Sequence, residues 1–318
     1  MDRLLPLIVL LAVCTLTAPT RSGADPGGLD TTFGGFGTGG VIPDLGFNAN
    51  AVAIDPQGRL VLVGTDSMSH FHVQRRSGPK LEMKEDASFF IDSGQVSSTA
   101  YAVAFDPNGK IIVAGDLLLK DRPSDFAVAR LTPDLKLDVS FAGGGTTSSD
   151  FNGGSDTAFG VVVQSDGKIV VAGAGKEDSS NGYTNIAIER FNADGNLDGG
   201  FGDGNGKRFI DIHASDGAQA VVLQPDGKIL VAGYAGTGNE PFYYDGVILR
   251  LNSDGSDDGN FGDSGRVTTR FSGHDTYLNS LALSGDNKIV VAGNDDAQDK
   301  SMEIARYLSN GAPDTTFA

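Results

Sequence analysis

Two stretches of the sequence carry oxygen-bearing side chains at alternating positions followed by a glycine, and they lie 60 residues apart. The residues are Asp194, Asn196 and Asp198 in the first stretch, and Asp254, Ser256 and Asp258 in the second. Oxygen ligands at this spacing are typical of the start of a calcium loop. Neither stretch has a glutamate at the closing position, and Asp with Gly also suits a tight turn between strands. A bound calcium ion and a plain turn are therefore alternatives, and the pattern favours the turn.

Aromatic residues form a second candidate site. Phe242, Tyr243 and Tyr244 are consecutive, and Tyr183 stands 60 residues before Tyr243. Exposed aromatic rings can stack on a sugar or anchor a protein partner. The same rings can instead pack a loop onto its own fold. This patch is the predicted ligand-binding site, whereas no phosphate loop, dinucleotide fingerprint or serine elbow identifies a catalytic group.

These candidates belong to a chain that repeats itself about every 60 residues. Five segments share a polar turn, a basic residue, an apolar run and a glycine. They are PQGRLVLVG at 56–64, PNGKIIVAG at 107–115, SDGKIVVAG at 165–173, PDGKILVAG at 225–233 and GDNKIVVAG at 285–293. Runs rich in Val, Ile and Phe, separated by Gly, Asp and Asn turns, predict four short antiparallel strands in each copy. In the fifth copy Asn287 replaces the turn glycine, and asparagine tolerates the left-handed conformation.

The repeat predicts an all-β fold, a five-bladed β-propeller of four-stranded antiparallel blades covering residues 25–318. A radial arrangement leaves only short, protected sheet edges. The segments 29–33 and 313–317 stand at the same phase of the repeat. We therefore expect the N-terminal strand near Val41 and Ile42 to complete the last blade, which otherwise ends with the strand at 304–307. An open solenoid is the alternative, but it usually carries distinct caps.

The copies resemble the delta-60 repeat family, whose signature is similar to DGK-[IV]-[VIL]-V-A-G, an alternating strand ending in Arg, and D-G-x-x-D-x-x-F-G. The resemblance covers nearly all of residues 28–318. It implies a propeller and, because the family is largely uncharacterised, no particular activity. The first copy departs from the signature, because its third strand at 71–76 leads into Lys80-Leu81-Glu82-Met83-Lys84 in place of the D-G-x-x-D-x-x-F loop. We expect irregular structure at that junction.

Propeller topology predicts two different faces. Turns between strands one and two, and between strands three and four, fall on one face, and the sequence repeats them almost unchanged. The connections on the other face differ in length and composition: 116–125, 174–185, 234–245 and 294–302. Divergent loops leave room for recognition. We therefore expect a ligand on the divergent face, called here the variable face, and only turns on the other, called the regular face.

Periodic arginines end the third strands at Arg130, Arg190, Arg250 and Arg306. Their matching phase predicts a structural pair between blades rather than an anion-binding ring. Acidic loop residues are the predicted partners, and Asp156, Asp216 and Asp275 are the candidates.

The first 24 residues read as a secretory signal. Arg3 precedes an apolar run at 4–16 that is too short to span a bilayer, and small residues follow at 22–24. A lipid anchor at Cys14 is the minority reading, because Val13 stands where a small residue is expected. The mature chain then has no cysteine for disulfides or thiolate metal sites. We expect a secreted, periplasmic or cell-surface protein that is a monomer without a membrane span.

The formal net charge is −17, and it becomes −18 once Asp2, Arg3 and Arg21 leave with the signal. Such a field disfavours nucleic acid as a partner. The leading hypothesis is a non-catalytic binding or scaffold module that holds an unknown protein or glycan, with calcium as the only candidate cofactor. The rival is a glycoside hydrolase or lyase with carboxylates on the central axis. Apolar inner strands such as 100–104 and 159–162 make that axis less suitable.

Overall fold

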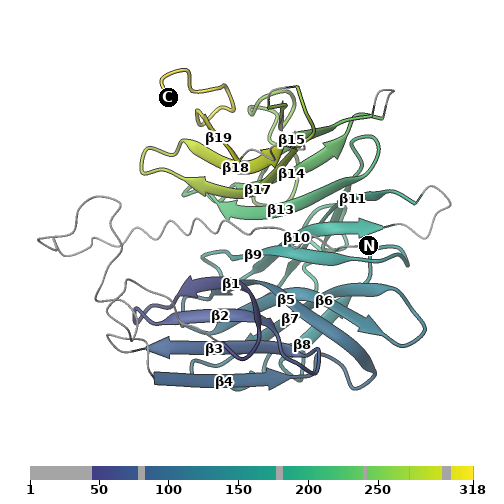
Figure 1. Cartoon of the computed structure of the whole chain (residues 1–318), viewed down its shortest axis with the longest axis vertical. Helices are drawn as coiled ribbons and strands as arrows, with labels where there is room; N and C mark the ends of the chain where they lie inside the picture. Colours follow the sequence, from purple (N-terminus) through teal and green to yellow (C-terminus); the bar gives the residue numbers. More distant parts are fainter. Residues whose placement is uncertain are drawn as a thin grey trace, which may run out of the picture.

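The computed structural model describes residues 45–77, 83–176, 182–238, 242–271, 273–295 and 302–317. This part of the chain forms nineteen β-strands in five antiparallel sheets and contains no α-helix (Figure 1). The all-β prediction is therefore confirmed. Among these residues no helix has the length and apolar character needed to cross a membrane. The predicted signal at 1–24 and Cys14 lie outside the described residues.

The five sheets follow the five sequence copies in order, and each strand pairs with the next one along the chain. Sheet one contains β1 (Asn48–Ile54), β2 (Leu60–Thr65), β3 (Phe71–Ser77) and β4 (Met83–Phe89). Sheet two contains β5 (Gln95–Phe105), β6 (Ile111–Leu119), β7 (Ser124–Leu131) and β8 (Thr146–Ser149). Sheet three contains β9 (Thr157–Val163), β10 (Ile169–Lys176), β11 (Thr184–Phe191) and β12 (Lys207–Ile210). Sheet four contains β13 (Asp216–Leu223), β14 (Ile229–Gly236), β15 (Tyr244–Leu251) and β16 (Arg266–Thr269), and sheet five contains β17 (Thr276–Leu283), β18 (Ile289–Asp295) and β19 (Met302–Tyr307).

The turn between the first two strands of each sheet requires one residue with a left-handed backbone. Glycine fills this position in four copies, with φ between 77° and 84°: Gly58, Gly109, Gly167 and Gly227. Asn287 takes the position in the fifth copy with φ of 60°. The prediction that Asn287 adopts the left-handed conformation of the turn glycine is therefore confirmed. Glycine and asparagine both reach this region at low cost.

A β-bulge interrupts the first strand of every sheet. In β13 the pairing passes from Ala218 to Ala220, so that Gln219 has no partner in β14. The equivalent bulge residues are Asn50, Tyr101, Phe159 and Asn279. The last glycine of each V-A-G or V-G segment lies directly beneath the bulge. A Cβ on Gly233 would lie only 1.9 Å from the carbonyl oxygen of Gly217, and its four equivalents are as tightly placed. The repeated glycine therefore exists to admit the bulged backbone.

The apolar core lies between sheets rather than in one central mass. Each of four buried clusters joins residues of two neighbouring sheets; for example, Ile112 and Phe126 of sheet two pack with Val171 and Ala187 of sheet three. Neighbouring sheets also pack through their first strands, β1 on β5, β5 on β9, β9 on β13 and β13 on β17. These first strands therefore surround the central axis, as a propeller requires.

The fifth sheet differs from the others because it has three described strands. The strand near Val41 and Ile42 that was predicted to complete it lies outside the described residues, and hydrogen bonds between described residues do not close the ring. Residues 78–82, which are part of the junction predicted to be irregular, also lie outside the described residues. The segment after this gap is regular, because β4 pairs with β3 without a register shift from Met83 to Phe89. Lys84, which was expected to be irregular, therefore lies in an ordinary strand.

Candidate functional site

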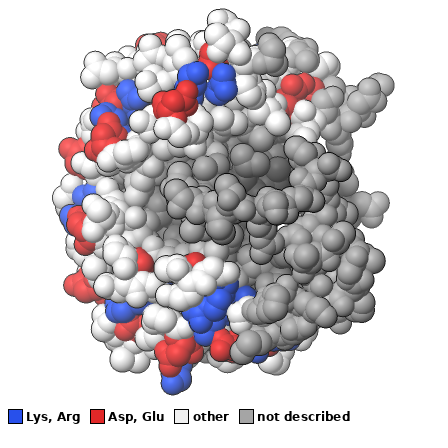
Figure 2. All heavy atoms as spheres, turned by 90° about the vertical axis from the view of Figure 1, so that its left-hand side faces the viewer, with Lys and Arg blue, Asp and Glu red and all other residues white. Residues whose placement is uncertain are grey.

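On the regular face, the repeated D-x-x-F sequence forms a three-residue unit with the arginine of the third strand. Arg190 donates from Nε to Asp198 at 2.8 Å, and its guanidinium lies 4.7 Å from the centre of the Phe201 ring. The same unit occurs in three other sheets: Arg130 with Asp138 and Phe141, Arg250 with Asp258 and Phe261, and Arg306 with Asp314 and Phe317. On this face, which is turned to the viewer in Figure 2, basic and acidic side chains lie interspersed around the rim.

These arginines also join neighbouring sheets, as the sequence predicted. Nη1 of Arg190 donates to the backbone oxygen of Ser253, and Nη1 of Arg250 donates to that of Ser309. The predicted acidic partners were wrong. Asp156 and Asp216 instead accept backbone N–H groups, each from its own loop and from the end of the second strand of its sheet, and Asp275 accepts that of Tyr244. The arginine therefore pairs with an aspartate of its own sheet and a carbonyl of the next.

The six residues of the proposed calcium loops all lie in these turns. Asp194 accepts hydrogen bonds from the backbone and side chain of Asn196, both at 3.0 Å. Asp254 accepts equivalent bonds from Ser256. Asp198 and Asp258 hold the arginines instead of turning toward these neighbours. The geometry therefore accounts for each side chain as part of a turn, and calcium binding there stays a prediction.

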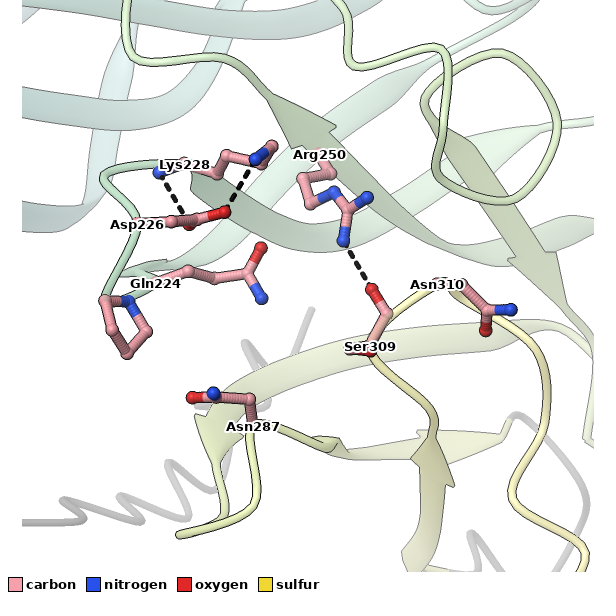
Figure 3. Close-up of a pocket in the computed structure, with 8 residues that line it drawn as sticks. Gln224, Asp226, Lys228, Arg250, Asn287, Ser309 and Asn310 are labelled. Carbon is pink, nitrogen blue, oxygen red and sulfur yellow. Dashed lines mark hydrogen bonds and ion pairs between the residues drawn. The ribbon is translucent and has the colours of Figure 1, made fainter.

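A hollow of about 340 Å³, which no sequence pattern indicated, lies on the regular face between sheets four and five (Figure 3). Its lining includes Gln224, Asp226, Lys228, Arg250, Asn287, Ser309 and Asn310. The Arg250 guanidinium is already engaged by Asp258 and by Ser309, whose bond Figure 3 shows. Lys228 is paired with Asp226 at 2.6 Å. Both cations are thus occupied by the protein, so the hollow offers a ligand little free charge.

On the variable face, the structure brings one predicted aromatic residue into a cluster with two others that sequence analysis missed. The ring of Tyr244 lies 5.6 Å from that of Tyr234 and 5.3 Å from that of Tyr277. Tyr234 and Tyr277 are themselves 5.4 Å apart. Only their phase could have signalled them, since Tyr234 directly follows the V-A-G segment and Tyr277 begins the next first strand. We call these three residues the tyrosine cluster.

The other predicted aromatic residues lie in the connections of the same face. Phe242 is 54% exposed and Tyr183 is 43% exposed. Tyr243 lies beneath the Arg270 guanidinium, 4.6 Å from ring centre to Cζ. The four predicted residues therefore divide into two exposed rings, one ring covered by an arginine, and one member of the tyrosine cluster.

Three of the five bulge residues contact the inner strand of a neighbouring sheet. The rings of Tyr101 and Phe159, from neighbouring sheets, are 5.3 Å apart, and the side chain of Asn50 donates to the backbone of Ala100. The remaining two members are Gln219 and Asn279, so none of the five is acidic. A glycoside hydrolase requires two carboxylates flanking the scissile bond. The residues that the bulges turn inward do not supply such a pair.

Comparison with known proteins agrees with this architecture. Four stretches match the family model described as "Domain of unknown function (DUF5122) beta-propeller", at residues 107–141, 164–201, 224–261 and 285–317. The chain is a repeat-built β-propeller. The irregular first copy lies outside these four stretches. No curated protein matches the sequence.

Several solved structures are similar to the chain at low sequence identity. A protein of unknown function from Bacteroides caccae has a TM-score of 0.50 and 12% identity, over 85% of this chain and 81% of that chain. A GH43 endo-arabinanase from Bacillus licheniformis has a TM-score of 0.38 and 11% identity, over 85% and 98%. A PL25 ulvan lyase has a TM-score of 0.47 and 12% identity, over 86% and 69%. Similarity at this level concerns the fold alone.

Proposed function

We propose that this propeller is an exported, non-catalytic binding module that holds a glycan or protein ligand on its variable face. One observation carries the proposal: the tyrosine cluster and the exposed rings of Tyr183 and Phe242 come from sheets three to five and lie on the face with the divergent loops. The repeated polar groups of the regular face, by contrast, are engaged within the protein.

A neutral glycan suits this surface. Aromatic rings stack on the apolar faces of sugar rings, and a tyrosine hydroxyl provides a hydrogen bond at the edge. A net charge of −17 does not oppose such a ligand, whereas it repels nucleic acid and anionic lipid. A protein ligand would use the same rings as buried anchors.

The test is a glycan array and a protein pull-down with the mature chain, followed by titration of the captured ligand. Replacing Phe242 or Tyr183 by alanine is expected to weaken binding by about tenfold, which is typical of a lost aromatic anchor. Both side chains are exposed, so folding should be unaffected. Val139→Ala is the matched control, because Val139 is 73% exposed on the regular face. Unchanged binding in both aromatic variants would contradict the proposed site, and turnover of a captured glycan would contradict a non-catalytic role.

We also propose that the segment near Val41 and Ile42 completes sheet five. The support is the state of β19, the third strand of that sheet. Ile304 is 50% exposed, whereas its equivalents Val128, Ile188 and Ile248 are fully buried under a fourth strand. A strand at a sheet edge that exposes apolar side chains has backbone N–H and C=O groups available for pairing with another strand.

Hydrogen exchange tests this closure. Removal of residues 28–44 is expected to increase amide exchange in β19 while exchange in β15, which lies inside sheet four, changes little. Equal protection of β19 in both chains would show that the segment does not pair there.

A further inference from the structure

Three aspartates converge where sheet two meets sheet three. Asp125 is the second residue of β7, and Asp150 and Asp156 lie in the connection from β8 to β9. One carboxylate oxygen of each lies within 4.8 Å of the others. Asp125 and Asp156 are buried, whereas Asp150 is exposed and keeps the group open to solvent on the variable face.

A fourth carboxylate, that of Glu189 on β11, lies close enough to interact with this group electrostatically. Glu189 is fully buried, and neither of its oxygens accepts a hydrogen bond of normal geometry. Side chains alternate along a strand, so Glu189 and Ala187 share one face of sheet three. Asp156 lies over that face, because a Cβ on Gly175 would lie 3.0 Å from Asp156 Oδ1 and 3.1 Å from the Ala187 Cβ. The Glu189 carboxylate therefore lies on the same side of sheet three as Asp156, and it interacts electrostatically with Asp156 and Asp125.

The described cations nearby do not balance this charge. Arg122 contacts Asp125, and Lys207, paired with Glu189 across the strands, directs its ammonium to the backbone oxygen of Asp150 and to the Phe151 ring. Four carboxylates and two cations leave a net charge of about −2 if all ionise.

The pKa values reflect the imbalance. Burial, aided by the charges of Asp150 and Asp125, raises the pKa of Asp156 to about 7. Burial likewise raises the pKa of Glu189 to about 8, and the nearby charges of Asp156 and Asp125 add to the rise against the effects of Ser149 and Lys207. Burial also raises the pKa of Asp125, although Arg122 opposes it.

The repeat supplies an internal comparison. At the junction of sheets four and five, the position of Asp150 is occupied by Arg270, which pairs with Asp245 at 2.6 Å. There Arg270 is the cation that pairs with Asp245, and Asp245 corresponds to Asp125. The position of Glu189 is apolar in three other sheets, as Ala129, Leu249 and Ala305. At the junction of sheets three and four this position is Asp211, and the position of Asp125 is Asn185. Of these three junctions, only that of sheets two and three combines all three aspartates with Glu189.

We propose that a divalent cation of the calcium class binds at this junction, with Asp125, Asp150 and Asp156 as ligands and Glu189 as a further buried carboxylate nearby. Oxygen-only ligands select hard cations, and calcium accepts irregular sets of carboxylates and waters. Exposure of Asp150 provides an entry path. The bound cation would compensate the aspartate charges at this junction, as Arg270 compensates Asp245 at the junction of sheets four and five.

Calorimetric titration of the full-length mature chain with calcium chloride, and melting in calcium against chelator, test the proposal. We expect saturation at about 0.1–1 mM, the range of extracellular calcium modules, and a rise in Tm at saturating calcium. Absence of both heat and Tm shift at about 10 mM calcium, well above that range, would overturn the proposal.

Variants then locate the ion. Asp150→Asn should abolish the calcium response, and Asp150→Arg, which copies Arg270, should abolish it while raising Tm in chelator. Asp211→Asn, at the equivalent position of the next junction, is the matched control and should keep the response. Asp254→Asn distinguishes the turns of the regular face: a response lost there but kept in Asp150→Asn would place the ion in those turns and refute the junction site.

Discussion

Replacement of Gly233 by alanine is expected to destabilise the propeller by more than about 3 kcal/mol, beyond the usual range for overpacking, because the obstacle is backbone. The added Cβ would lie 1.9 Å from the carbonyl oxygen of Gly217 and 2.9 Å from the Cα of Ala218. Neither atom can rotate away as a side chain would. Relief requires the bulge at Gln219 to be lost, and this would shift the register of β13 against β14. The measurement is the midpoint and slope of urea unfolding.

Gly285→Ala is the matched control. Gly285 lies in a turn of the regular face, where an added Cβ would meet no atom within 4 Å and the backbone has no left-handed φ. Alanine there should change the unfolding free energy by less than about 0.5 kcal/mol, or stabilise slightly through the unfolded chain. Equal, small effects of both substitutions would show that the bulge does not depend on the glycine.

Replacement of Asp258 by alanine is expected to cost about 3–5 kcal/mol, because it removes one partner of a buried ion pair and leaves the other charge uncompensated. Arg250 is 8% exposed and Asp258 is 3% exposed, and the two are 2.8 Å apart. Asp257→Ala is the control at the adjacent residue. The Asp257 side chain is 52% exposed in its pair with Arg208, so its loss should cost about 0–1 kcal/mol. Urea unfolding at pH 7 measures both, and equal costs would contradict a structural role for the buried pair.

The effect of Asp258→Ala should also depend on pH. Burial alone would raise the pKa of Asp258, but the backbone N–H of Asn260 and the Arg250 guanidinium outweigh it and hold the pKa below its ordinary value. A carboxylate with a lowered folded-state pKa binds fewer protons in the folded state than in the unfolded state. Its contribution is therefore complete above about pH 4, the pKa of an unfolded aspartate, and is lost as the pH falls. The difference between parent and variant should narrow from pH 5 to pH 2, and a constant difference would contradict this account.

Much of the fold follows from local sequence. Apolar runs of 4–8 residues between Gly, Asp and Asn turns determine the strands, since strand and turn preferences depend on near neighbours. Asn287 shows how specific this information is, because its left-handed conformation could be assigned from its alignment with four glycines. The regular face was predictable for the same reason, since its turns form within single copies.

The irregular first copy shows the limit of the repeat as a guide. Departure from the signature near Lys84 suggested irregular structure, yet β4 continues the sheet for seven residues. The first copy lacks the D-x-x-F turn residues, but its third and fourth strands still pair in regular register. Pairing with β3 needs backbone donors and acceptors, which that segment retains without the signature.

The repeat, the sheets and the division into two faces follow from the order of residues alone, whereas contacts between copies depend on how the sheets pack. That order could not show that Arg190 reaches Ser253 or that Tyr277 joins Tyr234. Each of these pairs joins two neighbouring sheets, so the contact forms only when the sheets pack side by side. Divergence among copies marks where such contacts differ, and only the packed structure shows which side chains meet.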